Sequence, residues 1–389
     1  MGTDSLAQTA SRWLTRLRNH LAWRWGRVRR MPGLLVNLWF GNLWHDHWLR
    51  RQVLITEGAL AATRRCAVYV MYPRLGLQDS HLTSLAYLAR KGCAPLVVSN
   101  LPLTPQERQR LQPLCWRLVE RPNYGYDFGA FREGVLMALD QLPGLGQLLL
   151  VNDSAWFPVP AAADWLAQAE RLDVDLAGAV SNDGWLDFLA DPGRGRPWVP
   201  DEGTPHLHYC SFALLFGARI LKDPGFRKFW QGLTLTADKL ETIRRGEVGL
   251  SRWVIDRGYR HAQTLDITRF DQHLERMDAD QLRELAANLV IPEDTALREE
   301  QRALTDLSAA PVDAATLRRF ILWATIATGP AYALPHWSLP EQGFGFLKKS
   351  PMWLSRPTAQ ITMSLIERYG DASMLEEARR LARGGRGTT

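Results

Sequence analysis

Arg121-Pro-Asn-Tyr-Gly-Tyr-Asp-Phe-Gly-Ala-Phe131 and, further along the chain, Leu148-Leu-Leu-Val-Asn-Asp-Ser154 are the two stretches that decide the fold. The first is typical of a polar, glycine-containing loop that opens a helix. The second is typical of a buried strand that ends abruptly in polar residues. Polar groups at the carboxyl end of a strand in an open α/β sheet lie where ligands bind. Two such features joined by one helix predict half of a nucleotide-type pocket.

Strand-like and helix-like segments alternate on both sides of these stretches. Apolar, β-branched runs predict strands at 66–72, 94–99, 115–119, 147–151, 176–180 and 211–216. Helical spacing of apolar residues predicts helices at 79–91, 104–112, 127–142, 223–260 and 271–328. Alternation of this kind predicts an α/β fold with a mostly parallel sheet flanked by helices.

The bulk composition is that of a folded globular protein. The chain has 389 residues, of which 46% are hydrophobic and 23% charged, enough for one elaborate domain or two smaller ones. Its four cysteines show no CxxC pairing. They are therefore interpreted as reduced thiols of a cytosolic protein rather than as a disulfide framework or a zinc site.

The positive charge is concentrated at the N-terminus. Residues 1–51 contain nine Arg and two Asp, a balance of +7 against a net +6 for the whole chain, and six of the sixteen Trp. On a helical projection Leu14, Leu21 and Trp25 share one face, and Arg16 and Arg27 lie roughly opposite. This pattern favours a helix lying in an anionic membrane interface.

Other interpretations of this arm stay open. It could dock on the protein's own body or a partner, or bind nucleic acid, although the slightly acidic remainder of the chain argues against the latter. The apolar stretch after Met31 is short and interrupted by Asn37 and Asn42, which excludes a secretory signal. No stretch approaches the ~20 clean apolar residues of a membrane-spanning helix.

The first candidate ligand-binding element is the turn that holds Asn123, Gly125, Asp127 and Gly129. Glycines four residues apart let the backbone turn tightly and approach a ligand. The N–H groups at the start of the following helix favour an anion. The spacing matches neither a Rossmann fingerprint nor a Walker loop. Asp127 has an alternative role as the cap of its own helix.

The second candidate element is Asn152-Asp153-Ser154, which follows four apolar residues. A carboxylate at that point must find a cation, hydrogen bonds or a ligand. Asp153 is therefore a candidate ligand for a divalent cation, Mg²⁺ or Mn²⁺, that bridges to substrate phosphates. A simple turn, or the cap of a later helix, is the alternative.

Four blocks of the chain resemble the rhamnan synthesis F family, whose members are associated with rhamnose-containing polysaccharides and lipopolysaccharide O-chains. The blocks are Arg121–Gly129, Asn152–Ser154, His206–Phe212 and Glu247–Ser251. The resemblance covers roughly residues 64–262, with a weaker similarity near 335–336 and 344–349. It implies a glycosyltransferase of GT-A type.

Under this resemblance the site residues take specific roles. The Asn-x-Gly turn and the Asn152-Asp153-Ser154 segment would hold the donor, although the latter has one carboxylate where common GT-A enzymes have two. Glu247 would be the base that removes a proton from the acceptor hydroxyl. A glutamate in the first turn of a helix is also favoured by the helix dipole alone.

The histidines and the arginine are more ambiguous. His206 and His208 would contact the acceptor or the diphosphate, or be structural. Arg121 would pair with a phosphate or lie on the surface.

The resulting hypothesis is a cytoplasmic glycosyltransferase, peripheral at the inner face of the cell membrane. The donor would be a nucleotide sugar, with dTDP-L-rhamnose implied by the resemblance, and the acceptor a polyprenyl-linked glycan or a polysaccharide. The alternative is a non-catalytic scaffold of a polysaccharide assembly complex. The expected organisation is a membrane-associating arm (1–60, with membrane contacts through 11–51), a GT-A-like domain (61–265), a helical region (266–380) and a disordered tail (381–389).

Overall fold

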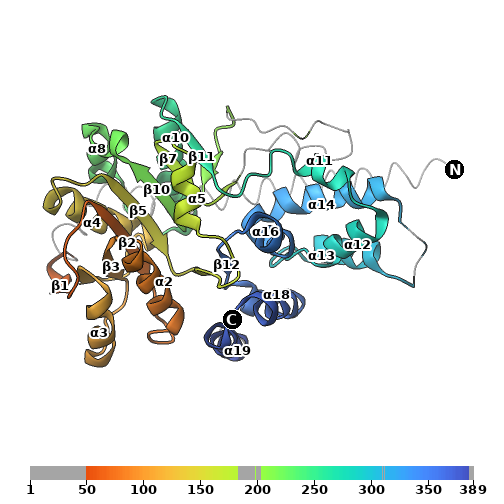
Figure 1. Cartoon of the computed structure of the whole chain (residues 1–389), viewed down its shortest axis with the longest axis horizontal. Coiled ribbons are helices and arrows are strands. Elements are labelled where there is room, and N and C mark those ends of the chain that lie inside the picture. Colours follow the sequence, from red (N-terminus) through yellow and green to blue (C-terminus); the bar gives the residue numbers. More distant parts are fainter. Residues whose placement is uncertain (1–49, 183–197, 199–202, 309, 311, 385–389) are drawn as a thin grey trace, which may run out of the picture.

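The computed structural model describes residues 50–182, 198, 203–308, 310 and 312–384. These residues form an eight-stranded sheet flanked by helices, with a further helical region beside it (Figure 1). The strand order across the sheet is β1-β4-β3-β2-β5-β10-β7-β11. The strands are β1 (Leu54–Glu57), β2 (Arg65–Met71), β3 (Ala94–Ser99), β4 (Arg117–Glu120), β5 (Gln147–Asn152), β7 (Leu176–Gly178), β10 (Ala213–Gly217) and β11 (His261–Gln263).

The centre of the sheet is parallel. β2 pairs in parallel with both β3 and β5, β3 pairs in parallel with β4, and β7 pairs in parallel with β11. β10 is antiparallel to its neighbours β5 and β7, and β1 is antiparallel to β4. The expected α/β fold, a mostly parallel sheet flanked by helices, is confirmed.

Helices cover both faces of the sheet because successive residues of a strand point to opposite sides. In β2, Val68 packs in one core with Phe131 of helix α4, whereas Tyr69 packs in another with Leu85 of helix α2. These four side chains are almost completely buried.

The helices follow the expected segments, and Figure 1 shows α11–α14 at the end of the molecule opposite β1. They are α2 (Asp79–Arg90), α3 (Pro105–Leu111), α4 (Tyr126–Gln141), α5 (Trp165–Arg171), α7 (Ala218–Leu221), α8 (Pro224–Gly232), α9 (Lys239–Thr242), α10 (Gly249–Asp256), α11 (Phe270–Glu275), α12 (Ala279–Ala287), α13 (Thr295–Thr305), α14 (Ala314–Thr328), α15 (Pro330–Ala333), α16 (Pro335–Gln342), α17 (Pro351–Leu354), α18 (Arg356–Tyr369) and α19 (Ala372–Gly384). Short 3₁₀ segments are η2 (Arg50–Gln52) and η3 (Gln112–Leu114), and η5 (Ile243–Val248) is π-helical.

The C-terminal region is tied to the sheet by a short strand pairing. Strand β12 (Leu347–Lys348) pairs antiparallel with β6 (Ala155–Trp156), which follows directly on β5. Trp156 and Leu347 are buried together against α16, α18 and α19. This pairing places Lys348 opposite Ala155, next to the polar segment that ends β5.

Two expected boundaries differ from the structure. Residues 54–57 fall in the expected arm but form β1, because their extended backbone pairs with β4 at the sheet edge. Helix α19 continues to Gly384, so residues 381–384 of the expected disordered tail are helical. Residues 1–49 of the arm and residues 385–389 of the tail lie outside the described residues.

Two further expectations concern the cysteines and the membrane. All four cysteines are buried and free, as expected. Within the described ranges, no helix has the combination of length and apolar character needed to cross a bilayer.

Candidate functional site

The candidate site lies at the carboxyl ends of the parallel strands. β5 ends at Asn152, and the neighbouring β2 is followed by Tyr72. Asp153 and Tyr72 are joined across these strand ends, because the Tyr72 backbone N–H donates to Asp153 Oδ2 at 2.8 Å. This edge of an open sheet is where ligands are expected.

The glycine turn before α4 is shaped by close backbone approaches. Gly125 has a φ of 77° and precedes the helix as its cap residue. A Cβ on Gly129 would lie 2.1 Å from the carbonyl oxygen of Tyr124, so no larger residue fits there. The two glycines therefore fix the backbone path that delivers Asp127 to the site.

Arg121 holds the backbone of this turn by hydrogen bonds. Its side chain is buried and donates to Asn100 Oδ1 at 2.6 Å and to the Tyr124 carbonyl at 2.7 Å. Burial lowers the pKa of Arg121 to about 10. Of the two alternatives for Arg121, the surface position is wrong, whereas the phosphate contact stays a prediction; the observed contacts position the loop. Asn123 is exposed at the tip of the loop.

Asp127 and Asn152 join the two segments. The Asn152 side-chain amide donates to Asp127 Oδ2 at 2.8 Å. The alternative interpretation was that Asp127 caps its own helix. That interpretation is wrong, because Gly125 occupies the cap position. Burial raises the pKa of Asp127 to about 6, and repulsion from Asp153 and Glu247 acts in the same direction. The glycine turn and the end of β5 therefore lie next to each other, as the expected pocket requires.

Ser154 extends this network to the C-terminal region. Its hydroxyl donates to Asn152 Oδ1 at 2.6 Å and accepts a hydrogen bond from Lys348 Nζ at 3.1 Å. Lys348 Nζ also lies 3.7 Å from the centre of the Phe212 ring and 5.5 Å from that of Tyr332. Burial lowers the pKa of Lys348 to about 8, against the attraction of Cys210, Glu247 and Asp127.

Asp153 belongs to a structural network at the same edge. Its Oδ2 lies 3.3 Å from His81 Nε2. The ring is oriented because His81 Nδ1 accepts from the Gln78 N–H at 3.1 Å, which leaves the proton on Nε2 facing the carboxylate. Burial opposes ionisation, but the hydrogen bond from His81, the charge of Lys349 and the hydrogen bond from the Tyr72 N–H hold the pKa of Asp153 below its ordinary value.

Lys349 forms a second, separate ion pair. Its Nζ contacts Glu377 Oε1 at 2.9 Å and donates to Ser80 Oγ at 2.7 Å. All three side chains are buried. This cluster joins α19 to the start of α2, beside the position of His81.

Glu247 lies inside a continuous helical stretch rather than in a first turn. It is part of the π-helical segment η5, between α9 and α10, so the helix-dipole explanation of this residue is wrong. Gly246 packs so closely that a Cβ there would lie 2.3 Å from the Phe128 ring. π-Helical turns are frequent at functional sites.

The carboxylate of Glu247 is held by one donor and faces a histidine. Its Oε1 accepts from the Ser211 N–H at 2.5 Å, and its Oε2 lies 3.8 Å from His208 Nε2. His208 Nδ1 donates to the His206 carbonyl at 2.8 Å, since a carbonyl oxygen only accepts. Nε2 of His208 faces the Glu247 carboxylate at a distance longer than a hydrogen bond. The His206 ring itself is exposed and takes no part in these contacts.

Among the described residues, the side chains at this edge form no ready-made site for the expected divalent cation, which stays a prediction. Within the described ranges, no three His, Cys, Asp or Glu side chains are grouped so that they could hold a metal ion. Asp153 is paired with His81, and Asp127 accepts from Asn152. The Lys348 ammonium places a positive charge among the remaining acidic groups.

Sequence reasoning named most of this site but missed part of it. The structure gathers Asp127, Asn152, Ser154, Glu247 and His208 around Lys348, with Asp153 beside them, whereas Asn123 and His206 are exposed. The missed members are Lys348, Ser211, Phe212 and Tyr332. Lys348 lies in the segment 344–349, and the weak similarity of this segment to the family was the available signal for it.

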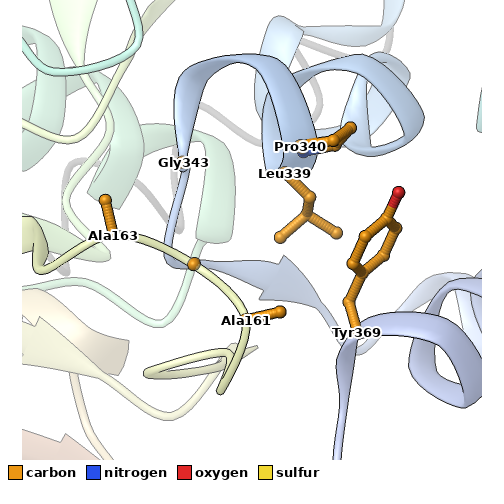
Figure 2. Close-up of a pocket in the computed structure, with 7 residues that line it drawn as sticks. Ala161, Ala163, Leu339, Pro340, Gly343 and Tyr369 are labelled. Atoms are coloured by element: carbon orange, nitrogen blue, oxygen red, sulfur yellow. The ribbon is translucent and has the colours of Figure 1, made fainter.

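Two cavities lie away from this cluster. One, of about 380 Å³, is bordered by the 161–163 segment, Leu339 and Pro340 of α16, and Tyr369 of α18 (Figure 2). The other, of about 600 Å³, lies between β1, α4 and α8. Neither is lined by a residue of the cluster.

Comparison with known proteins gives a family match. The model of the family described as rhamnan synthesis protein F matches residues 96–294, just over half of the chain. A protein of Sinorhizobium fredii (strain NBRC 101917 / NGR234), y4gN, is 28% identical over 198 residues. That match covers 51% of this chain and 48% of y4gN, so the chain spans about half the length of this relative.

Solved structures give weaker likenesses. Core-mannan synthase A from Aspergillus fumigatus, in its Mn/GDP form, is 10% identical with a TM-score of 0.32, over 54% of this chain and 74% of that one. The mannosyltransferase PcManGT from Pyrobaculum calidifontis, in complex with GDP-Man and Mn²⁺, is 13% identical with a TM-score of 0.31, over 92% and 91%. TM-scores of this size carry no conclusion about a shared site.

Proposed function

The chain belongs to the rhamnan synthesis protein F family, and from that premise we propose that it is a glycosyltransferase that uses a nucleotide-sugar donor. The observation that carries the proposal is the hydrogen bond from Asn152 to Asp127. It joins the end of β5 to the turn before α4, at the sheet edge where nucleotide ligands bind. Glu247 is close enough to raise the pKa of Asp127, so a carboxylate base adjoins the same cluster.

The transfer proceeds as a single displacement with inversion. The acceptor hydroxyl attacks the anomeric carbon, a new C–O bond forms, and the bond from that carbon to the diphosphate oxygen breaks. The hydroxyl proton passes to Glu247, and the nucleoside diphosphate leaves with the bonding electron pair. The Ser211 N–H fixes the Glu247 carboxylate, and the His208 ring lies beside it.

Family membership supports a donor such as dTDP-L-rhamnose and a polysaccharide or lipid-linked acceptor. A lipid-linked acceptor would give the basic, Trp-rich residues 1–51 a role as a contact with an anionic membrane surface on the cytoplasmic side. Flotation with anionic liposomes, comparing the whole chain with one lacking residues 1–51, tests this. Equal flotation of the two would remove the membrane contact from the proposal.

The test of function uses the purified full chain and the variant Glu247→Gln. Gln keeps an oxygen for the Ser211 N–H but is no base. We expect nucleotide-sugar turnover, measured as released nucleoside diphosphate, to fall by roughly 10²-fold or more. Donor binding, measured by thermal shift, should remain.

The matched control is Asp256→Asn on α10, whose carboxylate is exposed and pairs with Arg252. It should retain full turnover. Turnover that survives Glu247→Gln unchanged would contradict the assignment of the base. Donor binding without turnover in the unaltered chain would instead favour a scaffold, an alternative supported by the pairing of Asp153 with His81.

A further inference from the structure

The most unusual group at the proposed site is the Lys348 ammonium. Lys348 is 8% exposed and comes from β12, far along the chain from the other site residues. Lysine is almost never buried to this degree unless its charge is paired. Its placement therefore needs a reason.

Packing alone does not supply that reason. The adjacent Lys349 is equally buried, but it has Glu377 at 2.9 Å. Among the described residues, no carboxylate makes a salt bridge with Lys348. Its hydrogen bond goes to the neutral hydroxyl of Ser154, while Glu247 and Asp127 attract it without direct contact.

The ammonium also keeps donors for a ligand. An ammonium has three N–H donors, and Ser154 Oγ accepts one of them. The Phe212 and Tyr332 rings flank the charge through their π faces, which stabilise a cation without using a hydrogen-bond acceptor in the ring plane. Lys348 is thus a cation held in place beside the Asn152–Asp127 junction.

We propose that Lys348 binds the diphosphate of the nucleotide donor and supplies the positive charge there, so that nucleoside diphosphates bind this site without a divalent cation. This inference rests on the proposed glycosyltransferase function. The phosphate oxygens accept from the remaining Lys348 N–H donors, and the same charge stabilises the departing diphosphate. The absence of a three-ligand metal group among the described residues agrees with this assignment.

The experiment measures binding of UDP, GDP and dTDP, and of the corresponding nucleosides, by calorimetry. With the unaltered chain, excess EDTA should leave the affinity for the bound nucleoside diphosphate unchanged. Lys348→Met should lower that affinity by roughly tenfold or more, the effect of losing one charge-assisted contact. The affinity for the nucleoside, which has no phosphate, should stay the same.

Two variants complete the test. Lys228→Met removes an exposed lysine from α8 and should bind as the unaltered chain does. Lys348→Arg keeps the charge and should retain more affinity than Lys348→Met. The EDTA comparison on the unaltered chain stands even if a variant fails to fold.

The outcomes separate this inference from the proposed function. Binding that EDTA abolishes, or that Lys348→Met leaves intact, overturns the role of Lys348 while the glycosyltransferase proposal stands. Failure of every nucleoside diphosphate and nucleotide sugar to bind, with or without Mg²⁺ or Mn²⁺, overturns both.

Discussion

Replacing Lys348 by methionine is expected to raise the stability of the folded protein at neutral pH. Burial lowers the pKa of Lys348 from 10.5 to about 8. Each unit of this difference corresponds to 1.36 kcal/mol, so holding the ammonium in the fold costs about 3 kcal/mol. Methionine has a similar length and no charge, and it suits an apolar position between Phe212 and Tyr332.

This cost is an upper bound on the gain in stability, because the acidic neighbours of Lys348 lose their attraction to a cation. Glu247 and Asp127 attract the Lys348 charge, and methionine removes that attraction. We therefore expect an increase in the free energy of unfolding of about 1–3 kcal/mol at pH 7. A buried ion pair needed for folding would behave in the opposite way, with a loss when one partner is removed.

The pH dependence gives an internal check. A lysine whose pKa is lowered by folding destabilises the folded state below its folded pKa, and the penalty fades as the pH rises toward the unfolded value. The penalty should fall from about 3 kcal/mol at pH 7 to about 1 kcal/mol near pH 9.5. The advantage of Lys348→Met should shrink by the same amount.

Urea unfolding followed by fluorescence and circular dichroism at the two pH values measures this difference, with Lys228→Met as the matched control. The exposed Lys228 should give no change at either pH. A Lys348→Met protein that is less stable at pH 7, or whose advantage grows with pH, would refute the reasoning. It would show that Lys348 is a structural cation like Lys349.

Two other substitutions test the elements that support the site. Gly125→Ala should lower the free energy of unfolding, measured in urea, by about 1–3 kcal/mol, because the φ of 77° strains any larger residue and its Cβ would lie 3.0 Å from Leu235. Gly232→Ala, with open space around it, is the control. Equal effects of the two substitutions would contradict the inferred strain at Gly125. Glu377→Gln should lower the free energy of unfolding by about 3–5 kcal/mol, because it leaves the Lys349 charge buried without its partner. Glu376 is more than half exposed on the same helix, so Glu376→Gln should lower it little. A Glu377→Gln protein as stable as the unaltered chain would show that the ion pair is dispensable.

Local patterns were sufficient for six of the eight strands of the sheet and for half of the site. The apolar runs of β2, β3 and β5 are buried on both faces, which makes them recognisable without any partner. The turn at Gly125 and the end of β5 at Asn152 meet because parallel strands deliver their carboxyl ends to one edge. Each of these two features can be recognised from one short segment of the sequence.

The remaining contacts depend on pairings between distant segments. Lys348 enters the site through β12, a two-residue strand that has no period to recognise. The π-helical turn at Glu247 is indistinguishable from an α-helix in a hydrophobic pattern, so the pattern predicts only helix over 223–260. The sequence left Arg121 open between a phosphate contact and the surface, because its acceptors, Asn100 and the Tyr124 carbonyl, are visible only in three dimensions.

If Lys348 binds the donor diphosphate as proposed, the Asn152-Asp153-Ser154 segment needs no second carboxylate. Asp153 faces His81, and Asp127 comes from α4 instead. A divalent cation ~4 Å from the ammonium would be repelled by about 8 kcal/mol at an effective dielectric constant of ~20. Two or three carboxylates would have to share the metal to overcome that repulsion, whereas Asp153 already faces His81 and Asp127 accepts from Asn152. Under the proposal, Lys348 and a metal are thus alternatives at this edge, and a second acidic residue at position 152 would have no metal to bind.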